Sequence, residues 1–148
     1  MVSNDFLKTI LNTLLGNTSS ASCYLALSST LPNRNGSNVN EPSGNGYERK
    51  LLGSSSQTRY MSSATEVFDP ETGLSTNTVA SSNNQEIHFN EATGDWGTLG
   101  YFAIYSSKTG GTMLYSGTLT AEISPSVGHV VTIGVGELTI TLSANDVD

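Results

Sequence analysis

Residues 86–119 read EIHFNEATGDWGTLGYFAIYSSKTGGTMLYSGTL, and this stretch decides the fold. It begins with IHF, in which two apolar residues share one face of a strand and His88 points the other way. Residues 99–105, LGYFAIY, are almost all aromatic, aliphatic or β-branched, which predicts a strand covered on both sides. The glycines of SSKTGG favour a tight hairpin turn before MLYSGTL returns. We therefore predict a strand–corner–strand–turn–strand unit with the single tryptophan, Trp96, at its corner.

Shorter apolar runs separated by turn clusters continue this pattern on both sides of that unit. Residues 69–73, DPETG, have the composition of a turn between two such runs. Many short strands at this spacing predict a mainly β protein, an antiparallel β-sandwich or jelly-roll-like domain with a short N-terminal α-helix. The further strands are expected at residues 23–28, 47–52, 65–68, 77–80, 118–123, 129–133 and 138–142, with a weaker edge strand at 58–61.

The N-terminal segment, residues 1–16, has the pattern of an amphipathic helix. Its apolar residues recur at helical spacing and form one stripe, and Gly16 is a natural stop. The stripe either packs on its own domain or docks on a neighbouring subunit, because a three-turn helix at a terminus is marginal until it is packed. The stripe consists of Leu7, Ile10, Leu11, Leu14 and Leu15.

Three segments together carry a resemblance. EPSGNGYERK at residues 41–50, the stretch from IHFNEATGDWGT to YSGTL at 87–119, and VGELTITL at 135–142 resemble, in this order, a family of small bacteriophage virion proteins. Its typical members begin with a short helix, continue with a YLALS-like strand and a GYxR segment, and carry an ATGDWGT corner. The resemblance implies a structural protein of the virion, of the kind labelled tail-fibre, structural or capsid-decorating, and it implies no catalytic residue.

The long polar loop at residues 29–46 contains two prolines, three glycines and five asparagines. Loops of this length in a compact domain are usually functional or disordered, so we expect it to lie on a partner or to project outward. Apolar residues of the helix and of this loop are the candidate contacts with a partner. They are Phe6, Leu7, Ile10, Leu11, Leu14, Leu31, Pro32, Val39 and Pro42.

Composition narrows the class of protein. The length of 148 residues suits one domain, 1–148, which ends in a polar acidic tail at 144–148. The abundance of small polar residues (22 Ser, 18 Thr and 13 Asn) and the low fraction of charged residues, 13%, suit β-structure. The net charge of −7 and six scattered basic residues argue against nucleic-acid binding. Cys23 is the only cysteine, so no intrachain disulfide is possible. Neither a membrane span nor a signal peptide is evident, which predicts synthesis in the bacterial host cytoplasm and assembly into the virion.

Catalytic and metal-binding motifs were sought and none was found, so we expect no enzyme activity, no cofactor and no metal site. Asp69 and Glu71 are too few to hold a cation. Glu91 and Asp95, near the corner, fit solvated loop acids better than a carboxylate pair for glycan hydrolysis. Trp96 fits a core residue better than a platform on which a sugar stacks.

Two functions remain open. The first is a capsid cement or decoration protein that binds the major capsid protein on the outer surface of the head and stabilises capsomer contacts. This function needs no long shaft, and the sequence contains no repeat or coiled coil to provide one. The alternative is a tail-associated fibre, adaptor or receptor-binding protein that recognises host surface glycan through the long loop and Tyr24, Tyr47 and Tyr60. Either protein is expected to form a homodimer or homotrimer.

Overall fold

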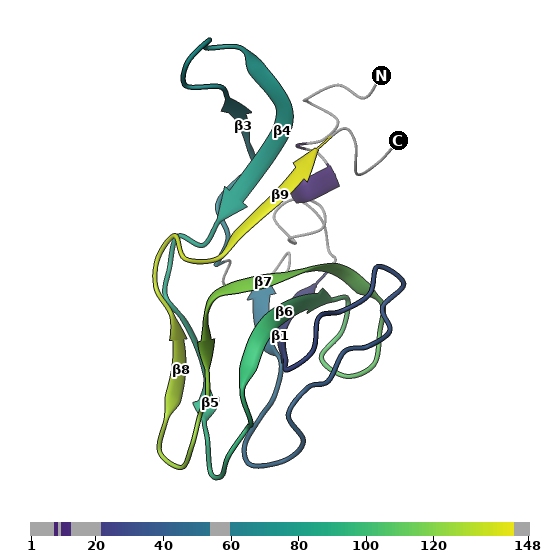
Figure 1. Cartoon of the computed structure of the whole chain (residues 1–148), viewed down its shortest axis with the longest axis vertical. Helices are drawn as coiled ribbons and strands as arrows, with labels where there is room; N and C mark the ends of the chain where they lie inside the picture. The colour runs from purple at the N-terminus through teal and green to yellow at the C-terminus, as the bar shows by residue number, and fades with distance from the viewer. Residues whose placement is uncertain (1–7, 9, 13–21, 54–59, 144–148) are drawn as a thin grey trace.

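The computed structural model describes residues 8, 10–12, 22–53 and 60–143. Within these residues the chain is mainly β, with every strand pair antiparallel and a short helical stretch at residues 8 and 10–12 (Figure 1). The expected fold class is confirmed, whereas the expected tail at 144–148 and most of the expected helix lie outside the described residues. The strands are β1 (Cys23–Ser28), β2 (Lys50–Gly53), β3 (Thr65–Phe68), β4 (Ser75–Ser82), β5 (Ile87–Glu91), β6 (Leu99–Tyr105), β7 (Met113–Ile123), β8 (Val130–Ile133) and β9 (Thr139–Ser143).

The main body is built from two of the three sheets. One has the order β2-β1-β6-β7 and the other is the pair β5-β8 (Figure 1). As predicted, β6 is the central strand, and all of its residues except Tyr101 are buried. The inward side chains of β1 and β6 meet those of β5 and β8 in one core. Burial of apolar side chains of this size stabilises the fold by ~1.5–3 kcal/mol each.

The outer face of β6 is covered as well, which the predicted pattern required. Ala26, Ala103 and Tyr105 form a second small cluster on that face, and Val39 of the long loop packs against it. The loop at residues 29–46 is held in place by its own hydrogen bonds, including Ser29 N to the carbonyl of Asn40 at 3.1 Å. Val39 of this loop thus covers the sheet, whereas Leu31 of the same loop is exposed, and the expected contact of the loop with a partner stays a prediction.

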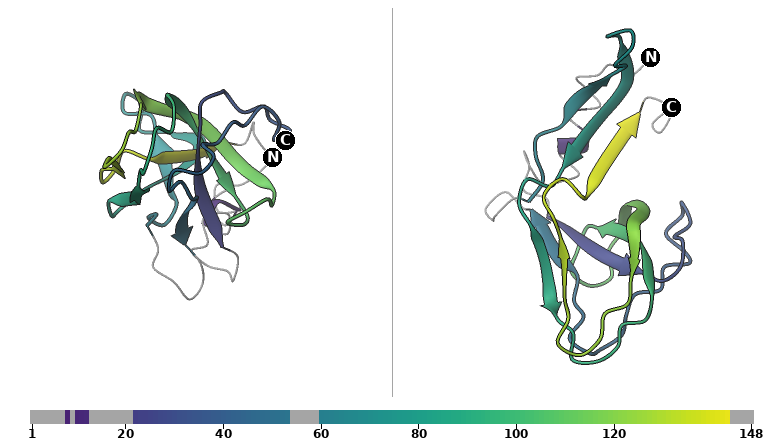
Figure 2. Two further views of the ribbon diagram at one scale, coloured as in Figure 1. Left: turned by 90° about the horizontal axis from the view of Figure 1, so that it is seen from below. Right: turned by 60° about the vertical axis from the view of Figure 1, so that its left-hand side comes forward.

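The third sheet, β3-β4-β9, extends away from the body (Figures 1 and 2). We call the part formed by β3, β4 and the turn between them the arm. The helical stretch packs at its base: Asn12 Oδ1 accepts a hydrogen bond from Ala64 N at 2.8 Å, and Lys8 pairs with Glu66 at 3.2 Å. The arm exposes the large apolar side chains of Val67, Phe68 and Leu74.

Several strand boundaries differ from the prediction, most of them by one or two residues, and three differences are informative. The second strand begins at Lys50, because the ring of Tyr47 turns inward to the corner. Strand β4 is longer than residues 77–80, since its exposed first half pairs with β3 and carries no apolar alternation. Residues 113–123 form one strand, β7, instead of two. Of the weak edge strand at 58–61, the described part is Met61, which makes an isolated bridge to Asn83.

The two sheets of the body are in contact along one side and, in the part of the chain that the structure describes, are not joined along the other. On one side β5 contacts β2, and Thr93 N donates to the carbonyl of Asn45 at 3.0 Å. On the other side, β7 and β8 each have a single hydrogen-bonded strand neighbour within the described chain. The body therefore resembles a barrel that is left open between β7 and β8.

Candidate functional site

The corner around Trp96 is a packed core and not an exposed platform. Trp96 is 5% exposed, and its ring meets Tyr47 edge to face at 5.3 Å and Phe89 at 6.4 Å. Its Nε1 donates to the carbonyl of Asn45 at 2.8 Å, which satisfies the polar atom of a buried indole. The prediction of a core tryptophan is confirmed, and Tyr47, which was expected to be exposed, belongs to the same cluster.

A half-buried ion pair between Arg49 and Glu41 ties the long loop to the β6–β7 hairpin. Arg49 donates from Nε and Nη2 to the two carboxylate oxygens of Glu41 at 3.0 and 2.8 Å. Its Nη1 donates to the carbonyls of Ser107 and Gly110, and its guanidinium carbon lies 3.7 Å from the ring centre of Tyr105. Because Arg49 forms a bidentate pair with Glu41 and also binds the hairpin, it holds the long loop and the hairpin in one arrangement.

The environment of this pair shifts the pKa of the groups around it. Burial, followed by the hydrogen bond that its hydroxyl donates to Glu41, raises the pKa of Tyr47. Burial also raises the pKa of Tyr105. For Arg49, burial lowers the pKa, but the hydrogen bond to Glu41 and the charge interactions with Glu41, Tyr105 and Tyr47 together outweigh it, so the pKa rises. These groups keep their ordinary charge states at neutral pH, so the pair acts as a structural latch.

The nine candidate contact residues fall into three groups. Phe6, Leu7 and Leu14 lie outside the described residues. Leu11 and Pro32 are buried within the chain itself, and Ile10, Val39 and Pro42 are half-buried. Leu31, 55% exposed, is the member of this set that presents its side chain to solvent. The partner interface stays a prediction, and Leu31 is its most accessible residue.

The acidic residues considered above for metal binding or glycan hydrolysis lie in turns and on the surface. Asp69 Oδ1 accepts the backbone N–H of Glu71 at 2.8 Å, which is the local hydrogen bond of a turn-forming aspartate. Glu91 and Asp95 are both exposed. Within residues 8, 10–12, 22–53 and 60–143, no three His, Cys, Asp or Glu side chains gather as a metal site would require, and no helix could span a membrane.

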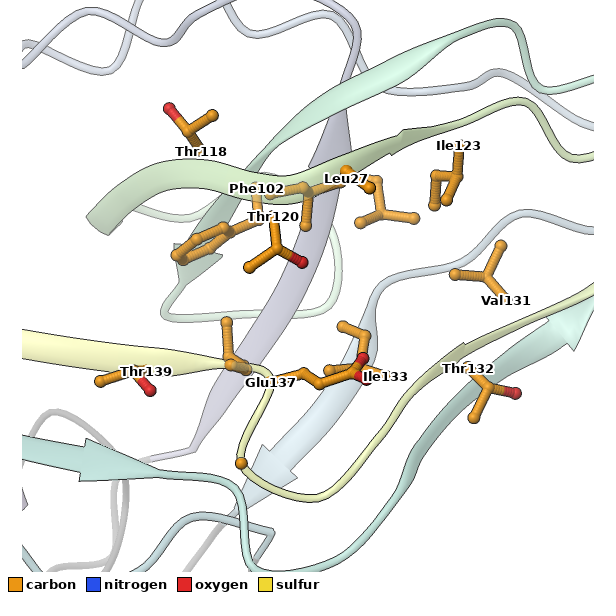
Figure 3. Close-up of a pocket in the computed structure, with 14 residues that line it drawn as sticks. Leu27, Phe102, Thr118, Thr120, Ile123, Val131, Thr132, Ile133, Glu137 and Thr139 are labelled. Atoms are coloured by element: carbon orange, nitrogen blue, oxygen red, sulfur yellow. The ribbon is translucent and has the colours of Figure 1, made fainter.

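A large cavity lies where the body is open. We call it the seam groove: it is the space between residues 118–123 of β7 and residues 131–139, with Leu27 and Phe102 beneath (Figure 3). Its volume is about 540 Å³, within the ~300–1,000 Å³ of typical ligand sites. Apolar side chains of both sheets line its interior and threonines line its rim, which gives a surface suited to an amphipathic partner.

Both long walls of the seam groove are strand edges. Thr118, Leu119, Thr120 and Ala121 line it consecutively, and so do residues 131–133 of β8. Successive side chains of a strand point to opposite faces, so a cavity on one face would be lined by alternate residues only. Consecutive lining therefore means that the cavity runs along the edge, where main-chain N–H and C=O groups point.

Part of β7 has no partner residues on β6. The register pairs Tyr101 with Thr118 and Leu99 with Ile123, so residues 119–122 form a bulge opposite Gly100. Just before this bulge, Gly117 lies directly over Phe102, and a Cβ at position 117 would meet the Phe102 ring at 2.6 Å. The strand thus contacts β6 closely at Gly117, whereas residues 119–122, along the groove, have no register partners on β6.

Neither the seam groove nor the latch was predicted from the sequence. Both depend on which strands become neighbours, and the partners of Arg49 are main-chain carbonyls, which no residue type reveals. A weak signal existed in the run TLTAEI at 118–123, where threonines alternate with apolar residues at the end of an unusually long strand. That alternation is typical of a strand with one solvated face.

Comparison with known proteins identifies the family. A family model described as "Podophage GP4 fiber I protein gp80" matches residues 1–141, which is nearly the whole chain. No curated protein matches the sequence.

Proposed function

Because the chain belongs to the podophage GP4 fiber I protein gp80 family, we propose that it is a non-enzymatic subunit of a fibre attached to the phage tail. It is a bacteriophage structural protein, and its location is the virion. The observation that carries the tail-fibre proposal is the extent of the match, since residues 1–141 contain β1 to β8 and the start of β9. The fibre role therefore attaches to this domain as a whole.

Its partners in this proposal are other proteins of the tail and further copies of itself, as a homodimer or homotrimer. The exposed apolar residues of the arm, Val67, Phe68 and Leu74, support a role in protein contact, because apolar side chains clustered on a protrusion are typical of interaction sites. The net charge of −7 disfavours contact with nucleic acid or with an anionic membrane surface.

Direct recognition of host glycan receives less support. The aromatic residues that first suggested it, Tyr24, Tyr47 and Tyr60, are all half-buried, and Tyr47 packs against Trp96. A sugar stacks on an exposed aromatic face, which these residues do not offer. We therefore propose an assembly or adaptor role within the fibre, not a receptor-binding one.

A capsid cement protein is the second candidate. The observation that favours it is that the sequence contains no repeat or coiled coil that would give a fibre its reach. In that case the partner is the major capsid protein.

Gold-labelled antibodies against the protein, followed by electron cryomicroscopy of purified particles, distinguish the two. Label confined to the tail is expected. Label spread over the head would replace the fibre proposal with the cement one, and particles without label would overturn both. A turnover number for the purified protein on phage-receptor polysaccharide, abolished by Glu91→Gln, would overturn the non-enzymatic role.

A further inference from the structure

The seam groove lies between two strand edges that face each other across an apolar interior. The edge of β7 that points away from β6 has no strand neighbour in the described chain, and β8 pairs only with β5 there. An unpaired edge presents a row of N–H and C=O groups at the spacing of a strand and is a template for another strand. Here two such templates border one cavity.

The chemistry of these walls selects an extended polypeptide as the occupant. Only a main chain in β-conformation offers donors and acceptors at the period of both edges, and strand addition of this kind is a common mode of peptide recognition. The buried side chains of Val131 and Ile133 and the apolar residues beneath offer contacts to every second side chain of such a strand. The threonines of the rim suit the polar residues in between.

Charge indicates which polypeptide it is. Among the described lining residues the charged one is Glu137, and Glu122 lies close by, against Gly100. The chain itself carries 13 acidic and 6 basic residues, so a second copy would bring mostly like charge to this place. A segment with Lys or Arg near Glu137 is complementary, as interfaces generally are.

We propose that the seam groove receives an extended segment of another virion protein, with apolar residues at alternate positions and a Lys or Arg facing Glu137. The segment completes the body by hydrogen-bonding to β7, to β8 or to both. This inference rests on the proposed function, because it needs the protein to be part of the particle.

The first experiment is photo-crosslinking within the assembled phage. The photoreactive residue p-benzoylphenylalanine replaces Thr120 on the β7 edge or Thr132 on the β8 edge, in phage whose own gene is blocked and complemented. Thr112 is the matched control, since it is exposed and lies beside the β6–β7 hairpin loop, away from the groove. Irradiated particles are digested and the crosslinked peptides are identified by mass spectrometry.

Both groove positions are expected to attach to one segment of one other virion protein, and the Thr112 position is not. Crosslinks to a second copy of this chain, the same products at Thr112, or no groove product from particles that contain the protein would each overturn the inference. Particles from which the protein is absent, as seen by immunoblot, would instead overturn the proposed function.

A pair of substitutions provides an independent test. Thr120→Lys places a charge on the groove rim, whereas Thr112→Lys adds the same charge elsewhere, and both purified variants should unfold at the wild-type urea concentration. Burying an unpaired charge under the docked segment is expected to lower the copy number of Thr120→Lys per particle at least about tenfold. Equal incorporation of the two variants would contradict the groove as the docking site.

Discussion

Asn83 and Leu138 exchange two hydrogen bonds, one through the main chain and one through a side chain. Asn83 N donates to the carbonyl of Leu138 at 3.1 Å, and Leu138 N donates to Asn83 Oδ1 at 2.9 Å. The amide Nδ2 of Asn83 donates to the carbonyls of Gln85 and Gly134. Since Leu138 and Gly134 belong to the turn between β8 and β9, this 2% exposed side chain positions one wall of the seam groove.

Replacing Asn83 by alanine is expected to lower the free energy of unfolding by about 3 kcal/mol, because the buried N–H of Leu138 and the part-buried hydrogen bonds to the carbonyls of Gln85 and Gly134 are lost at once. Urea denaturation followed by the fluorescence of Trp96 measures this change. Asn84→Ala, at the exposed neighbouring position, is the control and should stay within about 0.5 kcal/mol of wild type. Equal losses in the two variants would show that the Asn83 amide does not hold the turn.

Arg49→Lys is expected to cost about 2–3 kcal/mol of stability, because lysine keeps the charge but cannot reach Glu41 and the two carbonyls together. The chain offers its own control. Lys108 pairs with Glu48 at 3.2 Å between the same two segments, yet both side chains are 55% exposed. Lys108→Gln should therefore cost no more than about 0.5 kcal/mol. A larger loss at Lys108 than at Arg49 would contradict the latch.

Stability is expected to fall as the pH rises above 9. Burial raises the pKa of the Cys23 thiol from 9.0 to about 12, although a backbone hydrogen bond to Gly53 opposes the shift. Above pH 9 the unfolded chain loses this proton while the folded chain keeps it, so the free energy of unfolding declines by about 1.4 kcal/mol per pH unit. Below pH 9 both states hold the proton and the effect vanishes.

Urea denaturation under reducing conditions at pH 8, 9 and 10 measures this decline. Cys23→Ala starts from a lower stability because it leaves a small cavity, but it should lack the slope that the thiol contributes between pH 9 and 10. Tyr47 and Tyr105, whose pKa values are also raised, begin to contribute only above about pH 10. Parallel curves for the variant and the wild type would exclude Cys23 as the source.

Trp96→Phe is expected to lower the free energy of unfolding by about 2 kcal/mol, because it removes the hydrogen bond to Asn45 and leaves a void between Tyr47 and Phe89. Circular dichroism follows the unfolding, since the variant has no tryptophan. Tyr101→Phe, a half-buried position outside the corner, is the control. Unchanged stability in Trp96→Phe would show that the indole does not stabilise the core, and Trp96 would again be a candidate for stacking on a ligand.

Leu31→Ser should leave the free energy of unfolding within about 0.5 kcal/mol of wild type, because the side chain is already 55% exposed. If the loop contacts a partner, this variant is depleted from purified particles relative to Val127→Ser, which changes a residue that is 73% exposed in another loop. Equal copy numbers of the two variants, measured by quantitative mass spectrometry, would remove Leu31 from the interface.

Sequence predicts the strands that a core covers, and it also predicts the bounds of the mostly exposed β3, residues 65–68. Residues 23–28 and 99–105 have the predicted bounds, since side-chain alternation or a continuous apolar run marks a strand wherever a core covers it. The exposed half of β4 carries no such mark. Tyr47 was misplaced because its inward turn depends on Phe89 and Trp96, far along the chain. The seam groove was invisible for a related reason, since it exists only once β7 lies beside β6 and β8 beside β5.

The antiparallel pairing of β4 with β9 has a consequence during synthesis on the ribosome. Strand β4 is made about midway through the chain, whereas β9 is the last described strand to emerge. Until then β4 has only β3 to pair with, and Asn83 awaits its partner Leu138. Pairing between strands that are distant in the sequence slows folding and leaves unpaired, aggregation-prone strand edges exposed for a time. Nascent polypeptides truncated before β9 should therefore aggregate or bind chaperones, and native structure should form only after translation of residues 139–143.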